Sequence, residues 1–318
     1  MARRTHMAPF YPPRTRVSAA APPRRLAAGG AVPMSGLSPA TVEAAMHPML
    51  ATCLERVPVL PAHVQELFAL FHDPDADGRR VGEVVCRDPA LAAQTLRVCN
   101  APLFGLPVEV TSVHQAVVLL GMETVQGLAL ATYFQATLEE AKGLPGGWME
   151  GAADHSLACA HMGRWLLQAV GEPLQAGTAF TAGLLHDVGK LALVQLGREV
   201  ERAVLDRVGA GSDWLHAEAH VVGVTHAEAG GLVCERWGLP EVLVQAARFH
   251  HDPLEALNEP MACVVHLADR LAHAALEGPP EGGVLQAMEA GAWQALGIDD
   301  AEMAELAADL LELHAARG

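Results

Sequence analysis

The stretch Thr181-Ala-Gly-Leu-Leu-His186-Asp187-Val-Gly-Lys190-Leu-Ala-Leu193 places an adjacent histidine and aspartate inside an otherwise apolar run. The run is expected to be helical with a bend near Gly189, because apolar helix formers fill it on both sides of the pair. Burying an ionisable pair costs several kcal/mol unless hydrogen-bond partners or a metal ion compensate. We therefore expect other segments of the chain to supply partners for His186 and Asp187.

The composition favours a helix-rich protein with a large core. Of the 318 residues 51% are hydrophobic and only 4% aromatic, so Leu, Val and Ala must fill the interior. The six cysteines are scattered and form no CxxC pair, which indicates reduced thiols in a cytoplasmic protein. No apolar run reaches the roughly 18 residues that a membrane span needs, so no membrane association is expected.

The charge of the chain excludes some classes of partner. Residues 1–25 contain six arginines and no acid, whereas the whole chain has a formal net charge of −16. An acidic body should repel nucleic acid and anionic membranes, and no basic stripe with interleaved aromatic residues is present. DNA is therefore not an expected partner.

The chain divides into segments by composition. Residues 1–36, rich in Pro, Arg, Ala and Gly, lack periodicity and are predicted to form a disordered extension. The rest shows helical spacing and short connections without strand alternation, which predicts an all-α fold, a compact multi-helix domain. A linker that contains Gly and Pro separates an N-terminal helical half, 54–145, from a C-terminal half, 146–275. Two further helices, 283–296 and 299–316, could pack on this body or form a homodimer face.

Capping residues mark several helix ends. Asp88 before Pro89 starts one helix, and Ser112 starts another that Gly121 ends. Asn100 is expected to satisfy backbone groups near the end of a helix. The other expected helices of the two halves span 62–71, 80–85, 122–140, 149–170, 175–196, 198–209, 213–221, 225–237, 239–250 and 260–277.

Several ionisable residues of the C-terminal half stand in apolar helical surroundings, where their side chains should point inward. They are His155, His186, Asp187, His226, His250, His251 and Asp269. Imidazole and carboxylate groups on a helical bundle suit a divalent transition metal such as Mn, Fe, Zn or Ni. The set exceeds the need of one ion, so we expect two ions bridged by Asp187, an arrangement that suits phosphoryl displacement. Lys190 could then meet a phosphate oxygen.

Other histidines have a simpler interpretation. A lone histidine on an apolar helix face is usually a satisfied core or boundary residue. However, His266 and His273 flank Asp269 at three and four positions, so either could share its face. The residues interpreted as core or boundary histidines are His161, His216, His220, His266 and His273.

The order His155, His186-Asp187, Asp269 resembles the H…HD…D pattern of the HD superfamily of metal-dependent phosphohydrolases. His226 and the paired His250-His251 resemble the expanded two-metal set of its HD-GYP branch.

The N-terminal half favours a different branch, because its motifs, together with two motifs of the C-terminal half, resemble the HDOD family of HD-related output domains in bacterial signalling. The likeness rests on motifs that occur in order over about residues 54–275. They are Asp88-Pro-Ala-Leu91, Arg97-Val-Cys-Asn-Ala-Pro-Leu-Phe104, His114-Gln-Ala-Val-Val-Leu-Leu-Gly121, Gly183-Leu-Leu-His-Asp-Val-Gly-Lys190 and Trp237-Gly-Leu-Pro240.

The resemblance implies a regulatory output or scaffold protein whose HD-like half binds metal, with signalling proteins on separate chains or a nucleotide as partners. The alternative is an active phosphohydrolase on a nucleotide or cyclic dinucleotide, with Asp187 and Lys190 as catalytic residues. Two departures from the HD-GYP pattern weaken that alternative. No Gly-Tyr-Pro segment follows His251, and Gly151 stands where that branch commonly carries an additional acid. A purely structural helical protein without metal is the third interpretation.

Overall fold

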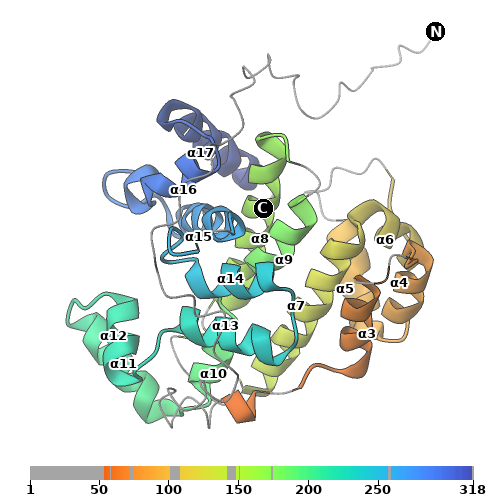
Figure 1. The fold of residues 1–318 in the computed structure, drawn as a ribbon, viewed down its shortest axis with the longest axis horizontal. Helices are drawn as coiled ribbons and strands as arrows, with labels where there is room; N and C mark the ends of the chain where they lie inside the picture. Colours follow the sequence, from red (N-terminus) through yellow and green to blue (C-terminus); the bar gives the residue numbers. More distant parts are fainter. Residues whose placement is uncertain are drawn as a thin grey trace, which may run out of the picture. The chain divides into compact units, whose positions relative to one another are not determined.

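The computed structural model describes most of the chain beyond residue 53. The described residues are 54–57, 59–71, 73, 75–100, 108–141, 148, 149, 151–172, 175–256 and 259–316. All regular elements among them are helices, which confirms the all-α class (Figure 1). The described residues lie in one compact unit, whereas the extension predicted for residues 1–36 lies outside them.

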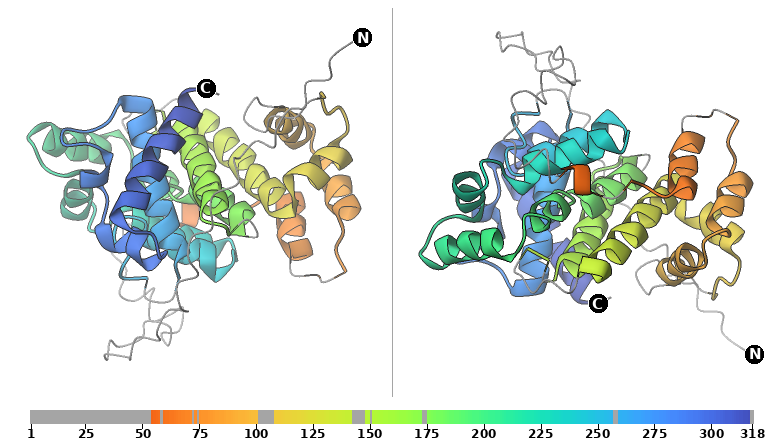
Figure 2. Two further views of the ribbon diagram at one scale, coloured as in Figure 1. Left: turned by 90° about the horizontal axis from the view of Figure 1, so that it is seen from above. Right: turned by 90° about the horizontal axis from the view of Figure 1, so that it is seen from below.

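The N-terminal helices begin and end close to the residues that the sequence marks. Asp88 caps α5 by accepting hydrogen bonds from the backbone nitrogens of Ala90 and Leu91 at 2.8 and 3.1 Å. Asn100 exchanges two 2.7 Å hydrogen bonds with the backbone of Val110, so it satisfies the backbone as expected. The helices are α3 (Ala62–Phe71), α4 (Gly78–Val85), α5 (Pro89–Cys99), α6 (Val113–Leu120) and α7 (Met122–Ala141). Figure 2 shows α3–α6 together on one side of α7.

The C-terminal part continues as helices on the other side of α7 (Figure 2). They are α8 (Ala152–Ala169), α9 (Ala176–Leu185), α10 (Lys190–Val194), α11 (Arg198–Gly209), α12 (Trp214–Val221), α13 (His226–Arg236), α14 (Glu241–Phe249), α15 (Met261–Glu277), the 3₁₀ turn η4 (Val284–Ala287), α16 (Ala290–Ala295) and α17 (Asp300–Ala315).

The helix expected over 175–196 with a bend near Gly189 is interrupted at that place rather than bent. α9 ends at Leu185, residues 186–189 form turns, and α10 begins at Lys190. The cause is a close approach to α13, where a Cβ added at Gly189 would lie 1.9 Å from the carbonyl oxygen of His226 and 2.3 Å from the nitrogen of Gly230. His186 and Asp187 are therefore presented from a turn rather than from within a helix.

The helix expected over 283–296 is also divided. It consists of η4 and α16, joined through Met288, whose backbone is extended with φ −105° and ψ 148°. Gly282 and Gly283 adopt positive φ values of 88° and 91° just before η4, a conformation that glycine tolerates and that does not continue a helix. The apolar residues of this C-terminal part pack against α15 and α8 in the common core (Figure 1). They include Trp293, Met303, Leu306 and Leu310.

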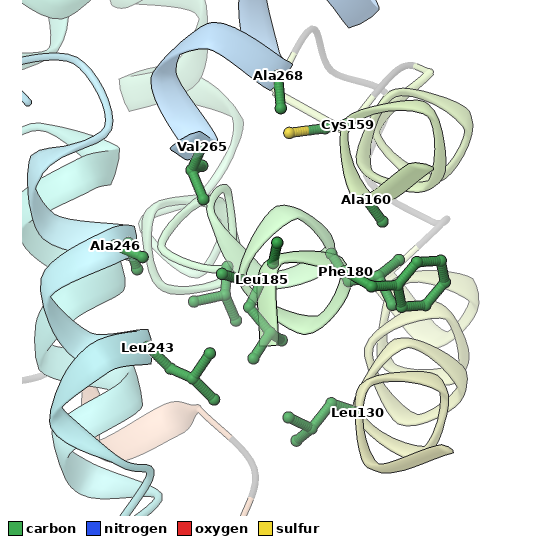
Figure 3. Packing of buried hydrophobic residues seen from close by; sticks show 14 of the residues in the cluster. Leu130, Cys159, Ala160, Phe180, Leu185, Leu243, Ala246, Val265 and Ala268 are labelled. Atoms are coloured by element: carbon green, nitrogen blue, oxygen red, sulfur yellow. The ribbon is translucent and has the colours of Figure 1, made fainter. Parts of the chain in front are cut away.

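Helix α9 lies at the centre of the core. Eight of its ten residues are buried, as expected for a helix that is apolar around most of its circumference. Figure 3 shows Phe180 and Leu185 of α9 surrounded by residues of α7, α8, α14 and α15. The labelled neighbours are Leu130, Cys159, Ala160, Leu243, Ala246, Val265 and Ala268. Since the chain turns at Leu185, α9 delivers His186 and Asp187 to the middle of these helices.

Among the described helices, none is both long and apolar enough to cross a membrane unaided. One sharply bent pair, Val113–Leu120 with Thr124–Leu130, meets the length and composition criteria jointly.

Candidate metal centre

The structure brings together all the residues expected to bind metal. His155 comes from α8, His186 and Asp187 from the turn after α9, His226 from the first position of α13, His250 and His251 from the end of α14, and Asp269 from α15. They form two donor groups that share Asp187.

The first donor group consists of His155, His186, Asp187 and Asp269. Nε2 of His155 lies 3.2 Å from Nε2 of His186 and 3.0 Å from Oδ1 of Asp269. Nε2 of His186 lies 3.4 Å from Oδ2 of Asp187. Two ligand atoms that bind one ion at ~2.1 Å with angles of 90–109° are about 3.0–3.4 Å apart. These donor atoms therefore have the spacing of ligands around a single ion.

The second donor group consists of Asp187, His226, His250 and His251. The other oxygen of Asp187, Oδ1, lies 3.3 Å from Nε2 of His226 and 3.9 Å from Nε2 of His250. Nε2 of His226 lies 2.9 Å from Nε2 of His251. The two oxygens of Asp187 thus face two different sets of imidazoles, which is the geometry of a bridging carboxylate. Three triads have ligand atoms close enough together to hold a metal ion: His155 with His186 and Asp187, His155 with Asp269 and His273, and His226 with His250 and His251.

Two atoms of the donor groups are buried without a hydrogen-bond partner among the described residues. They are Nε2 of His250 and Oδ2 of Asp269. A buried polar atom that forms no hydrogen bond costs about 1–3 kcal/mol. A bound cation would give both atoms a partner, so the chemistry and the packing of these donors fit a metal ion.

Hydrogen bonds behind the centre orient three of the imidazoles. Nδ1 of His186 donates to the carbonyl oxygen of Gly183, and Nδ1 of His250 donates to that of Ala247, both at 2.8 Å. Nδ1 of His226 lies 2.8 Å from Oε2 of Glu218. A proton on Nδ1 leaves the Nε2 lone pair facing the centre, as metal-binding histidines require.

Glu218 is a functional residue that the sequence did not reveal. It is fully buried on α12 and accepts hydrogen bonds from the His226 backbone nitrogen at 2.7 Å and from Nε1 of Trp148 and Trp214 at 2.9 Å. These donors compensate the burial of a carboxylate. No periodicity or motif in residues 213–221 distinguishes this acid from an exposed one.

The two aspartates of the donor groups are held in the ionised form. Burial raises the pKa of the Asp187 carboxyl, but the charges of Lys190 and of neighbouring imidazoles outweigh it, so the pKa lies well below its usual range. The pKa of Asp269 is also well below its usual range, because the hydrogen bond from His155 and nearby positive charge outweigh burial. Ionised carboxylates are the form that binds cations.

The buried imidazoles at the end of α14 are held neutral. Burial lowers the pKa of His250 well below its usual value and lowers that of His251 to about 3. The pKa of His186 is lowered for the same reason. For His155 burial also lowers the pKa, but the hydrogen bond and charge of Asp269 outweigh it and the net pKa is raised. Neutral imidazole is the form that binds metal.

The more exposed edge of the centre carries Lys190, Arg270 and His273. The Lys190 ammonium contacts Oδ2 of Asp187, so Lys190 lies beside the bridging carboxylate. Nε2 of His273 is 3.5 Å from Oδ1 of Asp269, and its Nδ1 is 3.2 Å from Oε1 of Glu277. The spacing of four residues from Asp269 was the available signal for His273, which was interpreted as a core or boundary histidine.

His266 lies outside both donor groups. Its Nδ1 donates to the carbonyl oxygen of His250 at 2.7 Å, and its Nε2 accepts from the backbone nitrogen of Glu289 at 2.9 Å. It therefore links the end of α14 to the start of α16. This satisfied, buried histidine confirms the simpler interpretation made from the sequence.

Comparison with known proteins identifies relatives of the whole fold. The family model for the HDOD domain matches residues 57–253. An uncharacterized protein of Treponema pallidum is 25% identical over 227 residues, which cover 66% of this chain but only 40% of that protein. The chain thus matches less than half the length of this relative.

Solved structures with the same fold come from several bacteria. An HDOD domain protein of unknown function from Geobacter sulfurreducens is similar with a TM-score of 0.66 and 25% identity, over 86% of this chain and 97% of that one. A candidate phosphohydrolase from Shewanella amazonensis is similar with a TM-score of 0.61 and 24% identity, over 85% and 98%. A candidate signal-transduction protein from Marinobacter aquaeolei is similar with a TM-score of 0.60 and 24% identity, over 84% and 64%.

Proposed function

The chain belongs to the HDOD family, and on that premise we propose that it is a signal-transduction output protein whose C-terminal half binds two divalent transition-metal ions. One observation carries the proposal: the two carboxylate oxygens of Asp187 face two separate groups of imidazoles. The first ion would be held by His155, His186, Asp187 and Asp269, and the second by Asp187, His226, His250 and His251.

The donor types support a transition metal over magnesium or calcium. Five imidazole nitrogens and two carboxylates make a nitrogen-rich set, whereas magnesium and calcium prefer oxygen ligands. Manganese, iron, zinc and nickel all accept such a set. The hydrogen bonds that orient His186, His226 and His250 support the same conclusion, because they pre-organise the Nε2 atoms for binding.

Metal analysis tests this function. Protein purified without chelator is analysed for transition metals, and protein freed of metal is titrated with Mn²⁺ or Zn²⁺. We expect up to two equivalents in the native protein and loss of binding in the double variant His186→Ala with Asp187→Ala. The exposed His216 on α12 gives the control variant His216→Ala. Absence of any bound transition metal from folded wild-type protein would reject the proposal.

A second candidate function is hydrolysis of a phosphate ester. It is favoured by two cationic side chains, Lys190 and Arg270, at the exposed edge of an otherwise acidic centre, where they could bind a phosphate group. A pair of divalent ions would supply Lewis-acid activation for such a reaction. Asp187 would hold both ions in place, and Lys190 would orient the phosphate.

A nucleotide panel separates the two functions. Cyclic and linear nucleotides are incubated with the manganese-loaded wild-type protein and with Asp187→Ala. Turnover by the wild type that is lost in the variant would favour the hydrolase, whereas binding without turnover would favour the output protein. Because no Gly-Tyr-Pro segment follows His251, we place cyclic dinucleotides below other nucleotides as substrates.

The expected partners are signalling proteins on separate chains. We propose the cytoplasm as their common compartment, because all cysteines among the described residues are free thiols, as in a reducing environment. A homodimer is a further proposal, tested by light scattering of the purified chain.

A further inference from the structure

A third set of donors lies beside the first donor group and shares two residues with it. Nε2 of His273 lies 3.5 Å from Oδ1 of Asp269, and Nε2 of His155 lies 3.0 Å from the same oxygen. Both distances are close to the spacing of about 3.0–3.4 Å expected for two ligands of one ion. The ligand atoms of His155, Asp269 and His273 all lie within 4.8 Å of one another. We call these three residues the outer triad.

The outer triad and the first donor group cannot hold separate ions at the same time. Nε2 of His155 also lies 3.2 Å from Nε2 of His186, so the same nitrogen faces both sets. An imidazole nitrogen has one lone pair and binds one ion at a time. Oδ1 of Asp269 faces both sets as well, since it is 3.7 Å from Nε2 of His186. The two sets are therefore alternative positions for the first ion.

The outer triad lies nearer to solvent than the donors it would replace. The side chain of His273 is 45% exposed, whereas that of His155 is 12% exposed and that of His186 only 1%. The rings of His155 and His273 approach each other, with their centroids 4.3 Å apart. An ion that enters on this side therefore meets His273 first and His155 next.

The charges at the exposed edge favour entry past His273. Lys190 and Arg270 are the other side chains described there, and each repels an approaching cation. Beside His273 lies instead the carboxylate of the exposed Glu277, whose Oε1 is 3.2 Å from Nδ1 of the ring. A carboxylate at this place attracts divalent ions from solvent.

We propose that the outer triad is the position at which the protein captures the first ion, with His273 as the residue that meets it. His155 and Asp269 then retain the ion while the buried donors of the first group replace His273. At least two protein ligands thus stay in place throughout the transfer. Release follows the same path in reverse. The inference rests on the proposed metal-binding function.

The rates of metal binding test the proposal. The metal-free, full-length chain is mixed with Co²⁺ in a stopped-flow instrument, and uptake is followed by the visible absorption of the bound ion. Release is followed after the loaded protein is mixed with excess EDTA. The same measurements in a His251→Ala background, which lacks a ligand of the second donor group, isolate the first position.

The substitution His273→Ala should slow the uptake of Co²⁺. We expect the association rate constant to fall at least about tenfold, the lower end of the effect that local concentration of a charged ligand has on association rates. The dissociation rate constant should not rise, because entry and release share one path. It should fall less than the association rate constant, since losing the outer triad also removes one of the two bound positions.

Two further variants serve as controls. His273→Asp keeps a side chain that binds divalent transition metals at the same place and should restore most of the association rate. His220→Ala removes an exposed histidine of α12 and should change neither rate.

Three results would overturn the capture role and leave the metal function intact. They are faster dissociation with unchanged association in His273→Ala, which would make His273 an ordinary ligand, unchanged rates in both directions, and uptake by His273→Asp as slow as by His273→Ala. A folded wild-type protein that binds no Co²⁺ would reject the metal function itself, and the capture role with it.

Discussion

Glu218 and His226 form a buried carboxylate–imidazole pair, with 2.8 Å between Oε2 of the acid and Nδ1 of the ring. The same oxygen accepts from the backbone nitrogen of His226 at 2.7 Å, so one carboxylate holds both the ring and the start of α13. Because two tryptophan indoles bind the other oxygen, the acid itself has little freedom to move. The orientation of His226 toward the centre thus depends on a residue of α12.

Substitution Glu218→Gln should weaken the second metal position by about 10–100-fold, because the ring of His226 loses the charged acceptor that orients it. It should also reduce the free energy of unfolding by about 1–3 kcal/mol. The side-chain NH2 of glutamine would face N–H groups of the indoles or of His226, and neither group could then accept a hydrogen bond from the other. Metal titration and urea denaturation measure the two effects. The control is Glu199→Gln on the exposed side of α11, which should change neither quantity. Unchanged metal affinity in Glu218→Gln would show that His226 is oriented without the acid.

Substitution His273→Ala should lower the affinity of the first metal position severalfold. Nε2 of His273 lies 3.5 Å from Oδ1 of Asp269, and its Nδ1 lies 3.2 Å from Oε1 of the exposed Glu277. Since the side chain is 45% exposed, unfolding in urea should be nearly unaffected. The exposed His220 on α12 gives the control variant His220→Ala. Identical first-step dissociation constants for wild type and His273→Ala would exclude a ligand role.

His161 should make the protein sensitive to acid. Burial, followed by the charges of Arg164 and His314, lowers the pKa of His161 to about 3, whereas an unfolded chain has a histidine pKa of about 6.5. As the pH falls below about 6.5, His161 binds a proton in the unfolded state but not in the folded state. Stability is therefore lost progressively down to pH about 3, by up to about 1.4 kcal/mol per pH unit from this residue.

Urea denaturation at several pH values, for the wild type and for His161→Phe, measures this effect. The variant keeps a ring in contact with Trp165 and Phe180 but cannot titrate. Its free energy of unfolding should fall less steeply between pH 6 and 4 than that of the wild type. The other histidines titrate in both proteins and cancel in the comparison, so parallel curves would contradict the assignment.

Substitution Gly189→Ala should destabilise the fold and disrupt metal binding together. The added Cβ would lie 1.9 Å from the carbonyl oxygen of His226 and 2.3 Å from the nitrogen of Gly230, so α10 and α13 must separate. We expect a loss of at least about 1–3 kcal/mol, the usual cost of overpacking. Gly209→Ala is the matched control, because its Cβ meets nothing within 4 Å and Gly209 ends α11. Equal stability of the two variants would show that α10 and α13 adjust freely.

The local sequence was sufficient to predict most helix boundaries. Asp88 and Ser112 cap helices through hydrogen bonds to backbone nitrogens two or three residues away, and Gly121 ends a helix through its own backbone conformation. These effects can be predicted from the neighbouring residues in the sequence. The break after Leu185 could not be recognised in this way. It accompanies an approach of Gly189 to His226, a contact between segments far apart in the chain.

The types and the order of the ionisable residues also followed from the sequence, because an imidazole or carboxylate within an apolar run needs a partner whatever the fold. The division of these residues into two donor groups depends on where five separate segments of the chain meet. The roles of Glu218 and His273 depend on contacts of their side chains with His226 and Asp269, eight and four residues away, and on ring orientation. Spacing along a chain carries no information on which ring nitrogen bears a proton. The folded arrangement supplies it, because each hydrogen-bond partner either donates or accepts.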